Sequence, residues 1–195
     1  MATLYARAGR PPISGRLTFK ADVEGAGRSA AAFMGSLAGG GTIKLDDAQF
    51  ANLNPRVFDA VIRAVDLGIP TDANRIRDFV ATSLDGAGLP VSRATANIKI
   101  AAGQLRLADV VTEAVGVGVV LAAALDLTSA SLDANLTMSG RQTIGGTDRP
   151  TVLIAIKGAL PTPQRRIDAK LLASWLAPRS VDQQDGGPGP QGHQQ

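Results

Sequence analysis

Apolar and polar residues alternate one by one along much of the chain. Leu17, Phe19, Ala21 and Val23 are separated by polar or charged residues, and the alternation returns in residues 94–100 and again in 132–138. Successive side chains of a β-strand point to opposite faces, so this pattern predicts strands with one dry and one wet face. We expect further strands at residues 42–45, 104–107, 110–115, 117–127 and 151–157.

Three other segments repeat their apolar residues at steps of three and four, which is typical of a helix with one buried side. The first has Asn54 as its expected N-cap and ends before Gly68. The second starts near Asp72 and stops at Gly86, and the third, a short one, is capped by Asp168. The sequence therefore predicts about three short helices among the strands.

Glycine and small polar residues mark the connections between these elements. A short apolar helical stretch at residues 30–37 lies among glycines, and Asp46 and Asp47 predict a turn. Residues 101–103 and 128–130 have the composition of hairpin turns. Short connections of this kind favour strands that pair antiparallel with their neighbours in the chain.

Two segments resemble each other at a fixed distance along the chain. Residues 42–50 and residues 97–105 each have the pattern of a strand, a small-residue turn and a second strand. One interpretation is an internal repeat that extends a sheet by reusing one hairpin unit. The other is that any two amphipathic hairpins look alike, and the sequence leaves both open.

Length and composition fit one domain with a tail. The chain has 195 residues, of which 45% are hydrophobic and 4% aromatic, so the core must be built from aliphatic side chains. Gly (22 residues) and Pro (11 residues) favour many strands and turns over a helical bundle. We expect an irregular lead at 1–14, an α+β domain at 15–178 and a disordered tail at 179–195.

Charge and residue usage argue against several functional classes. The net charge is +3, and the densest basic clusters, Arg75/Arg77 and Arg165/Arg166, hold two residues each, so we expect no nucleic-acid partner. The chain has no Cys, and its one His lies in the predicted tail. No phosphate-binding loop of the GxxxxGK[ST] type is present. We therefore predict no catalytic residue, no cofactor, no metal site and no enzymatic activity.

The recurring apolar stripes are the remaining candidate for a functional surface. They are either the closed core face of a sheet or, in part, an open face that receives acyl chains. Small aliphatic side chains offer a smooth surface without hydrogen-bonding specificity, which suits a lipid tail. The sequence does not separate the two. The residues expected on this face are Leu17, Phe19, Ile43, Leu45, Ile98, Ile100, Leu105, Leu107, Leu136, Met138 and Ile154.

The order of these pieces resembles the C-terminal region of the AsmA-like family. The resemblance covers about residues 13–178 and rests on the order of four stretches of glycine and alternating aliphatic residues. These are residues 33–50 followed by the helix at 53–65, residues 94–107, the hairpin at 125–136, and residues 156–163, which resemble the family's closing strand.

The resemblance implies a curved, mostly antiparallel sheet with its helices packed at one end or face. It also implies a non-enzymatic protein of the Gram-negative envelope, held in the inner membrane by a helix that this chain lacks and extending into the periplasm. Such a protein would support outer-membrane assembly or carry phospholipid, or another acyl-chain lipid, along an apolar β-groove. Envelope proteins are the other class of partner that the resemblance implies. The alternative is a scaffold module that docks partners at a sheet edge.

Overall fold

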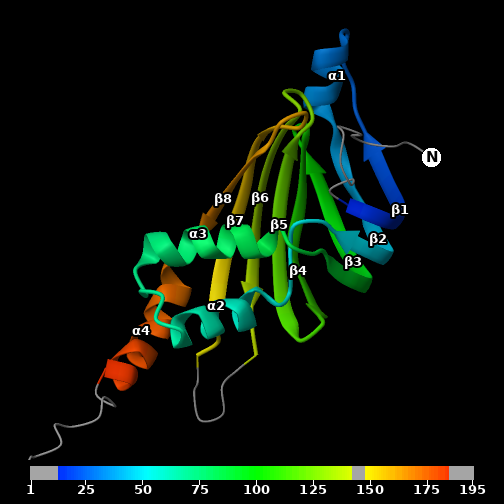
Figure 1. Ribbon diagram of the computed structural model, residues 1–195. Helices are drawn as coiled ribbons and strands as arrows, with labels where there is room; N and C mark the ends of the chain where they lie inside the picture. The colour runs from blue at the N-terminus through cyan, green and yellow to red at the C-terminus, as the bar shows by residue number, and fades with distance from the viewer. Residues whose placement is uncertain (1–12, 142–147, 185–195) are drawn as a thin grey trace, which may run out of the picture.

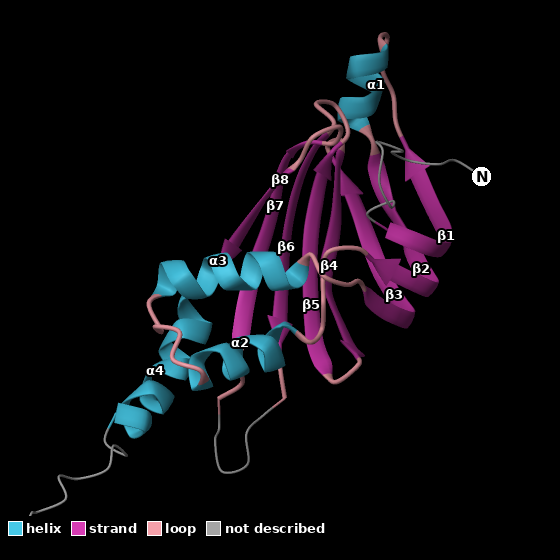
Figure 2. Ribbon diagram, in the orientation of Figure 1, coloured by secondary structure: helices cyan, strands magenta, loops and turns pink. Residues whose placement is uncertain are grey.

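The computed structural model describes residues 13–141 and 148–184, which form an α+β fold with one open sheet (Figure 1). The sheet has eight strands, and each pairs antiparallel with the strands before and after it in the chain. Four helices accompany the sheet (Figure 2). The predicted fold class is therefore confirmed.

The strands follow one another with short connections, except where helices are inserted. The helices are α1 (Ala30–Ser36), α2 (Val57–Asp66), α3 (Ala73–Leu84) and α4 (Lys170–Gln184). The strands are β1 (Ile13–Glu24), β2 (Ala38–Phe50), β3 (Leu89–Ala101), β4 (Gln104–Ala114), β5 (Val117–Asp126), β6 (Ser131–Ser139), β7 (Thr151–Ala159) and β8 (Gln164–Asp168).

The antiparallel order gives the sheet two different ends. At one end, which we call the turn end, lie α1 and the turns that follow β3, β5 and β7. At the other, which we call the helix end, α2 and α3 connect β2 to β3, and α4 follows β8. In Figure 1, α2 and α3 pass in front of the sheet, whereas α1 stands beyond the strand ends at the top.

The main core forms where α2, α3 and α4 pack on one face of the sheet. Val61, Val80 and Leu172, one from each helix, are fully buried, and so are Met138 and Val152 on the strands beneath them. Each such side chain contributes about 1.5–3 kcal/mol of transfer free energy. This cluster fastens the helix end of the sheet to its three helices.

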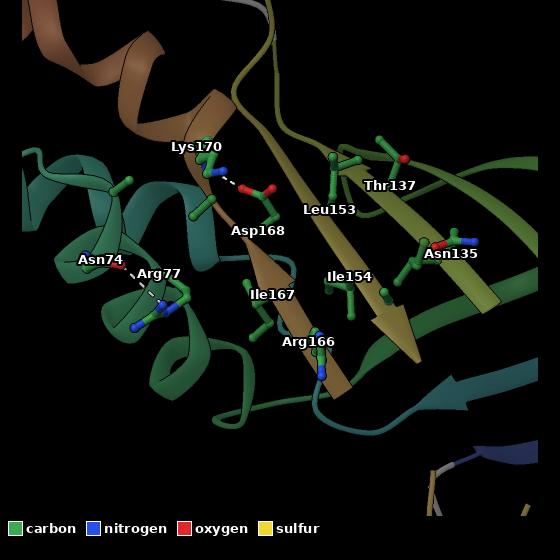
Figure 3. Close-up of a pocket in the computed structure, with 14 residues that line it drawn as sticks. Asn74, Arg77, Asn135, Thr137, Leu153, Ile154, Arg166, Ile167, Asp168 and Lys170 are labelled. Carbon is green, nitrogen blue, oxygen red and sulfur yellow. Dashed lines mark hydrogen bonds between the residues drawn. The ribbon is translucent and has the colours of Figure 1, made fainter. Parts of the chain in front are cut away.

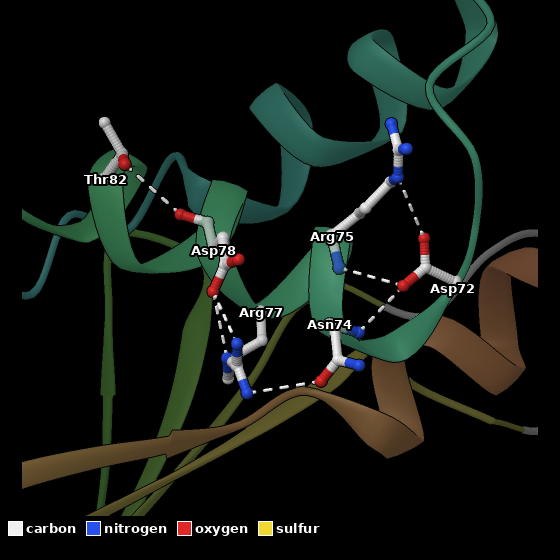
Figure 4. A network of polar contacts seen from close by, with 6 residues as sticks. All are labelled: Asp72, Asn74, Arg75, Arg77, Asp78 and Thr82. Atoms are coloured by element: carbon white, nitrogen blue, oxygen red, sulfur yellow. Dashed lines mark hydrogen bonds and ion pairs between the residues drawn. The ribbon is translucent and has the colours of Figure 1, made fainter.

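A side-chain cap fixes where α3 begins. Asp72 Oδ1 accepts hydrogen bonds from the backbone N–H groups of Asn74 and Arg75, each at 3.1 Å, so the predicted start of α3 is confirmed. The same aspartate forms an ion pair with Arg75, and Arg77 pairs with Asp78 on the exposed side of the helix (Figure 4). Exposed pairs of this kind add little stability.

Asn54 is not the N-cap of α2, as the sequence had suggested. Arg56 occupies that position, and Asn54 Oδ1 accepts a hydrogen bond from its backbone N–H at 3.0 Å. The Asn54 side chain also donates to the Ser83 carbonyl at 3.0 Å. Asn54 therefore ties the start of α2 to the end of α3, a tertiary role that a local capping pattern does not reveal.

The turn predicted at Asp46 and Asp47 is wrong, because β2 runs through both residues. Asp47 has φ 50°, and the pairing of β1 with β2 shifts register at this point, opposite Gly15. The two aspartates mark a β-bulge, which lets a strand bend without ending. Asp46 forms an ion pair at 3.0 Å with Arg93, its register partner on β3.

The proposed internal repeat is also wrong at the level of structure. Residues 97–105 form the hairpin of β3 and β4, whereas residues 42–50 lie within the single strand β2. Thr42 pairs with Asn97, so the two segments are neighbours in the sheet and not equivalent units. Similarly, the strands predicted at 104–107 and 110–115 are one strand, β4, with an irregularity between Leu107 and Val110.

The described structure is longer than the predicted domain at its C-terminal side. β8 was not predicted, and α4 continues through Pro178 to Gln184, into the predicted tail. β1 begins at Ile13, within the predicted lead. The rest of that lead (1–12) and of the tail (185–195) lies outside the described residues.

Candidate functional site

All eleven residues predicted for the apolar face lie on one face of the sheet. Directly opposed residues of antiparallel strands point to the same side. Phe19 pairs with Ile43, and Leu17 pairs with Leu45. The pairing then carries this face from β1 to β7 through a continuous row: Ala21, Gly41, Ile98, Leu107, Ala123, Ala134 and Ile156. On β8 the row ends at Arg165, the partner of Ile156.

The helices cover only part of this face. Leu136, Met138 and Ile154 are 7%, 0% and 1% exposed and belong to the core formed with α2, α3 and α4. Leu45 is partly buried at the margin of that core. For these residues the interpretation as closed core is correct.

The same face is open on β1. Leu17 and Phe19 are 62% and 51% exposed, and Val23, further along the strand, is 47% exposed. None of the three belongs to the helix-covered core. The apolar stripe of β1 therefore faces solvent, although it continues the surface that is closed on β6 and β7.

A third group of residues on this face is half-buried or buried although it lies outside the helix-covered core. Ile43, Leu105 and Leu107 are half-buried, and Ile98 and Ile100 are buried although they lie outside that core. The register sets glycines of β2 beside both isoleucines, Gly41 opposite Ile98 and Gly39 opposite Ile100. On their other side, Ile98 pairs with Leu107 and Ile100 with Leu105 on β4.

The sequence analysis missed several members of this face. Leu125 and Leu132 pair across the β5–β6 hairpin and carry the face toward the turn end, where both are half-buried. β5 was ambiguous because its other side is also apolar, with Val120 and Ala122. In β6, Leu132 is four residues before Leu136 in a strict alternation, so the pattern places both leucines on the same face.

Away from β5 and β7, the opposite face of the sheet is mainly polar. Lys20, Lys44 and Asn97 are exposed between the apolar positions of their strands. Two ion pairs join neighbouring strands there, Asp46 with Arg93 at 3.0 Å and Asp133 with Lys157 at 2.9 Å. The alternation therefore predicted a wet and a dry face correctly for the strands that have one polar side.

A separate pocket of about 470 Å³ lies at the edge of the sheet beside β8 (Figure 3). Its charged residues are Arg77, Arg166, Asp168 and Lys170. Arg77 is held by Asn74 and Asp78, and Asp168 accepts the backbone N–H of Lys170 at 2.9 Å. The one acidic group in this pocket therefore bonds to the backbone at the start of α4.

Three further observations complete the account of possible sites. Within residues 13–141 and 148–184, no group of acidic or histidine side chains is arranged to hold a metal ion. Across the same residues, no helix has the length and hydropathy needed to cross a membrane.

The backbone N–H of Ser129, with help from that of Thr128, lowers the pKa of Asp126 at the β5–β6 turn.

Comparisons with protein-family models, with curated proteins and with solved structures find no match to this chain.

Proposed function

We propose that this chain is a non-enzymatic part of a Gram-negative envelope protein that guides phospholipid acyl chains through the periplasm along the apolar face of its sheet. In this proposal the whole protein belongs with the AsmA-like family and supports outer-membrane assembly. Its anchorage in the inner membrane would come from a segment outside this chain.

The observation that carries the proposal is the extent of the apolar face beyond its helix cover. A sheet that needed only a core would end its apolar stripes where the helices end. Here the stripes continue onto β1, where Leu17 and Phe19 are more than half exposed. Soluble monomers rarely expose extended apolar patches unless these bind something.

The chemistry of the open part favours an acyl chain over a polar ligand. The side chains there are Leu, Ile, Val, Ala and Phe, none of which has a hydrogen-bonding group. Each methylene that leaves water for such a surface gains about 0.8 kcal/mol, so a long chain binds without specific contacts. The apolar row runs from β1 to β7, so the surface offers a path and not a single pocket.

Site-specific photo-crosslinking tests the proposal. A photoreactive residue at Phe19 or Leu107 should form adducts with phospholipid, seen by mass spectrometry, when the protein is incubated with dispersed lipid. Leu136 is a poor reporter because it is buried under the helices.

Lys20 provides the matched control for this experiment. It neighbours Phe19 on the same strand, and its side chain points to the polar face. A probe there should capture no lipid. Equal lipid capture at Lys20 and Phe19, or no capture at Phe19 and Leu107, would contradict the proposal.

A second candidate function is docking of an envelope protein at the free edge of β1. This strand is 12 residues long, pairs with β2 alone among the strands of residues 13–141 and 148–184, and all but one of its residues are exposed. Long free edges accept an added strand from a partner. Crosslinks from Lys20 to a protein, together with an absence of lipid adducts at Phe19, would favour this function.

A further inference from the structure

The turn end of the sheet is almost free of charge. Four connections make up this end: residues 25–37, 102–103, 127–130 and 160–163. Arg28 is the one charged residue among them. The connection at the helix end between β2 and β3 is different, since residues 51–88 contain nine charged side chains: Arg56, Asp59, Arg63, Asp66, Asp72, Arg75, Arg77, Asp78 and Asp85.

These uncharged connections form a continuous rim. The Gly103 N–H donates to the Leu37 carbonyl at 3.1 Å, and the Leu127 N–H donates to the Gly103 carbonyl at 2.9 Å. The Leu160 N–H donates to the Ala130 carbonyl, also at 2.9 Å. The hydrogen bonds therefore join α1 and the turns into one surface across the end of the sheet.

Helix α1 is the most prominent part of this rim. It has the sequence AAAFMGS, and none of its residues is buried. Phe33 is 44% exposed, and Figure 1 shows the helix projecting beyond the strand ends. Ala, Phe and Met are the side chains that this helix can place in the apolar part of an interface.

Several polar backbone groups of the rim are already satisfied within the protein. Ser29 Oγ accepts the Ala32 N–H, and Ser36 Oγ accepts the Ala26 N–H at 2.8 Å. Asp126 accepts the N–H groups of Thr128 and Ser129. Because unpaired polar groups are costly outside water, these bonds lower the free energy needed to move the rim into a lipid interface.

Two basic side chains lie just behind the rim. Lys99 and Arg106 are directly opposed on β3 and β4, both are exposed, and neither forms an ion pair within the described residues. Like charges at opposed positions destabilise a sheet. Acidic residues lie further along the same end, Asp22 and Glu24 on β1 and Asp133 on β6, so the excess of positive charge is local to β3 and β4. Anionic headgroups would complement this opposed pair.

We propose that the turn end docks on a phospholipid bilayer, with α1 entering the interface at Phe33 and Lys99 and Arg106 facing anionic headgroups. This inference rests on the proposed function and extends it. Docking by this end would bring one end of the apolar face to a membrane, where lipid could enter or leave the protein.

Vesicle binding tests the inference on the full chain. Vesicles of phosphatidylethanolamine and phosphatidylglycerol should bind the protein, and Phe33→Glu should lower the partition coefficient about tenfold, which corresponds to about 1.4 kcal/mol. Phe33→Leu should retain binding. Leu67→Glu is the matched control, because Leu67 is 88% exposed at the helix end, and it should leave binding unchanged.

A fluorescent probe supplies an independent reading of the same contact. The chain has no Cys, so Phe33→Cys and Leu67→Cys each create one labelling site. A polarity-sensitive dye at position 33 should shift to the blue on vesicles, and a dye at position 67 should not. A blue shift only at position 67, or equal vesicle binding by the wild type and Phe33→Glu, would overturn the inference.

The outcomes also separate this inference from the proposed function. Phe33→Glu should not change the capture of dispersed lipid at Phe19. Lipid capture without vesicle binding would overturn docking and support lipid carriage. Vesicle binding without lipid capture would overturn lipid carriage and support docking. Binding only to vesicles that contain membrane protein would overturn bilayer docking and assign this end to a protein partner.

Discussion

At the scale of single residues, the open and closed parts of the apolar face contain the same kinds of side chain. Leu17 and Leu136 are both leucines in alternating strands, yet one is 62% exposed and the other 7%. The difference comes entirely from what lies above them. Position in the alternation therefore determines the face to which a side chain belongs, and for these two leucines the helix cover determines whether the side chain meets water.

Asp126 shows how one side chain holds a turn of the rim together. Its carboxylate accepts two backbone N–H groups, and these bonds, led by that of Ser129, lower its pKa. A group whose pKa is lower in the folded state stabilises the fold above its unfolded pKa. That contribution is lost as the pH falls through the folded pKa.

We predict that Asp126→Asn lowers the melting temperature at neutral pH and that the difference from the wild type shrinks in acid, below the ordinary pKa of an aspartate. Thermal melts over a pH series measure this. Asp66→Asn, which makes the same charge change at an exposed position of α2, is the control and should differ little from the wild type. A difference for Asp126→Asn that stays constant into acid would contradict the assigned role.

At the scale of elements, the helix cover divides the sheet into a stabilising part and a part available for binding. Ile154 is 1% exposed beneath the helices, whereas Leu17 is 62% exposed on the edge strand. We predict that Ile154→Ala costs about 2–5 kcal/mol of unfolding free energy through the cavity that it leaves.

Leu17→Ala should cost less than about 0.5 kcal/mol, as expected for a surface position. Urea unfolding of the two variants measures both values. Similar losses for Ile154→Ala and Leu17→Ala would mean that β1 is as well covered as β7, and the open face would then be excluded.

The sequence predicted the elements best where a strand has one polar side. The alternation in β1, β3 and β6 gave both the strands and their faces. It failed for β8, which has a single apolar residue, Ile167, and was ambiguous for β5, which is apolar on both sides. It also failed at Asp47, because a residue type common in turns is equally suited to a bulge.

The extent of the cover could not be predicted from the sequence at all. Ile98 and Leu136 have the same alternating context, but only Leu136 lies beneath the helices. That outcome depends on where the α2–α3 connection folds back over the sheet, which is a long-range property. The short α1 was predicted as a helical stretch, but its place in an uncharged rim emerges only when four distant connections meet at one end.

At the scale of the whole molecule, stability and proposed function are located at different places. The buried core ties β5, β6 and β7 to three helices, while β1 is an edge strand without a buried residue. Elements with few buried contacts open locally at a free energy far below that of global unfolding. The part proposed to hold lipid is therefore also the part least held by the protein itself.

We predict that this asymmetry appears in hydrogen exchange. Amides of β6 and β7 should exchange only through global unfolding, whereas those of β1 should exchange through local opening, and orders of magnitude faster. Adding dispersed phospholipid should slow exchange in β1, because a ligand that binds the closed form stabilises it by mass action. Exchange in β6 should slow by no more than the same factor, since the bound lipid is also lost in global unfolding. Exchange in β1 as slow as in β6 without lipid would show that the edge strand needs no ligand. Exchange in β1 that stays unchanged when lipid is added would contradict lipid binding at its apolar face.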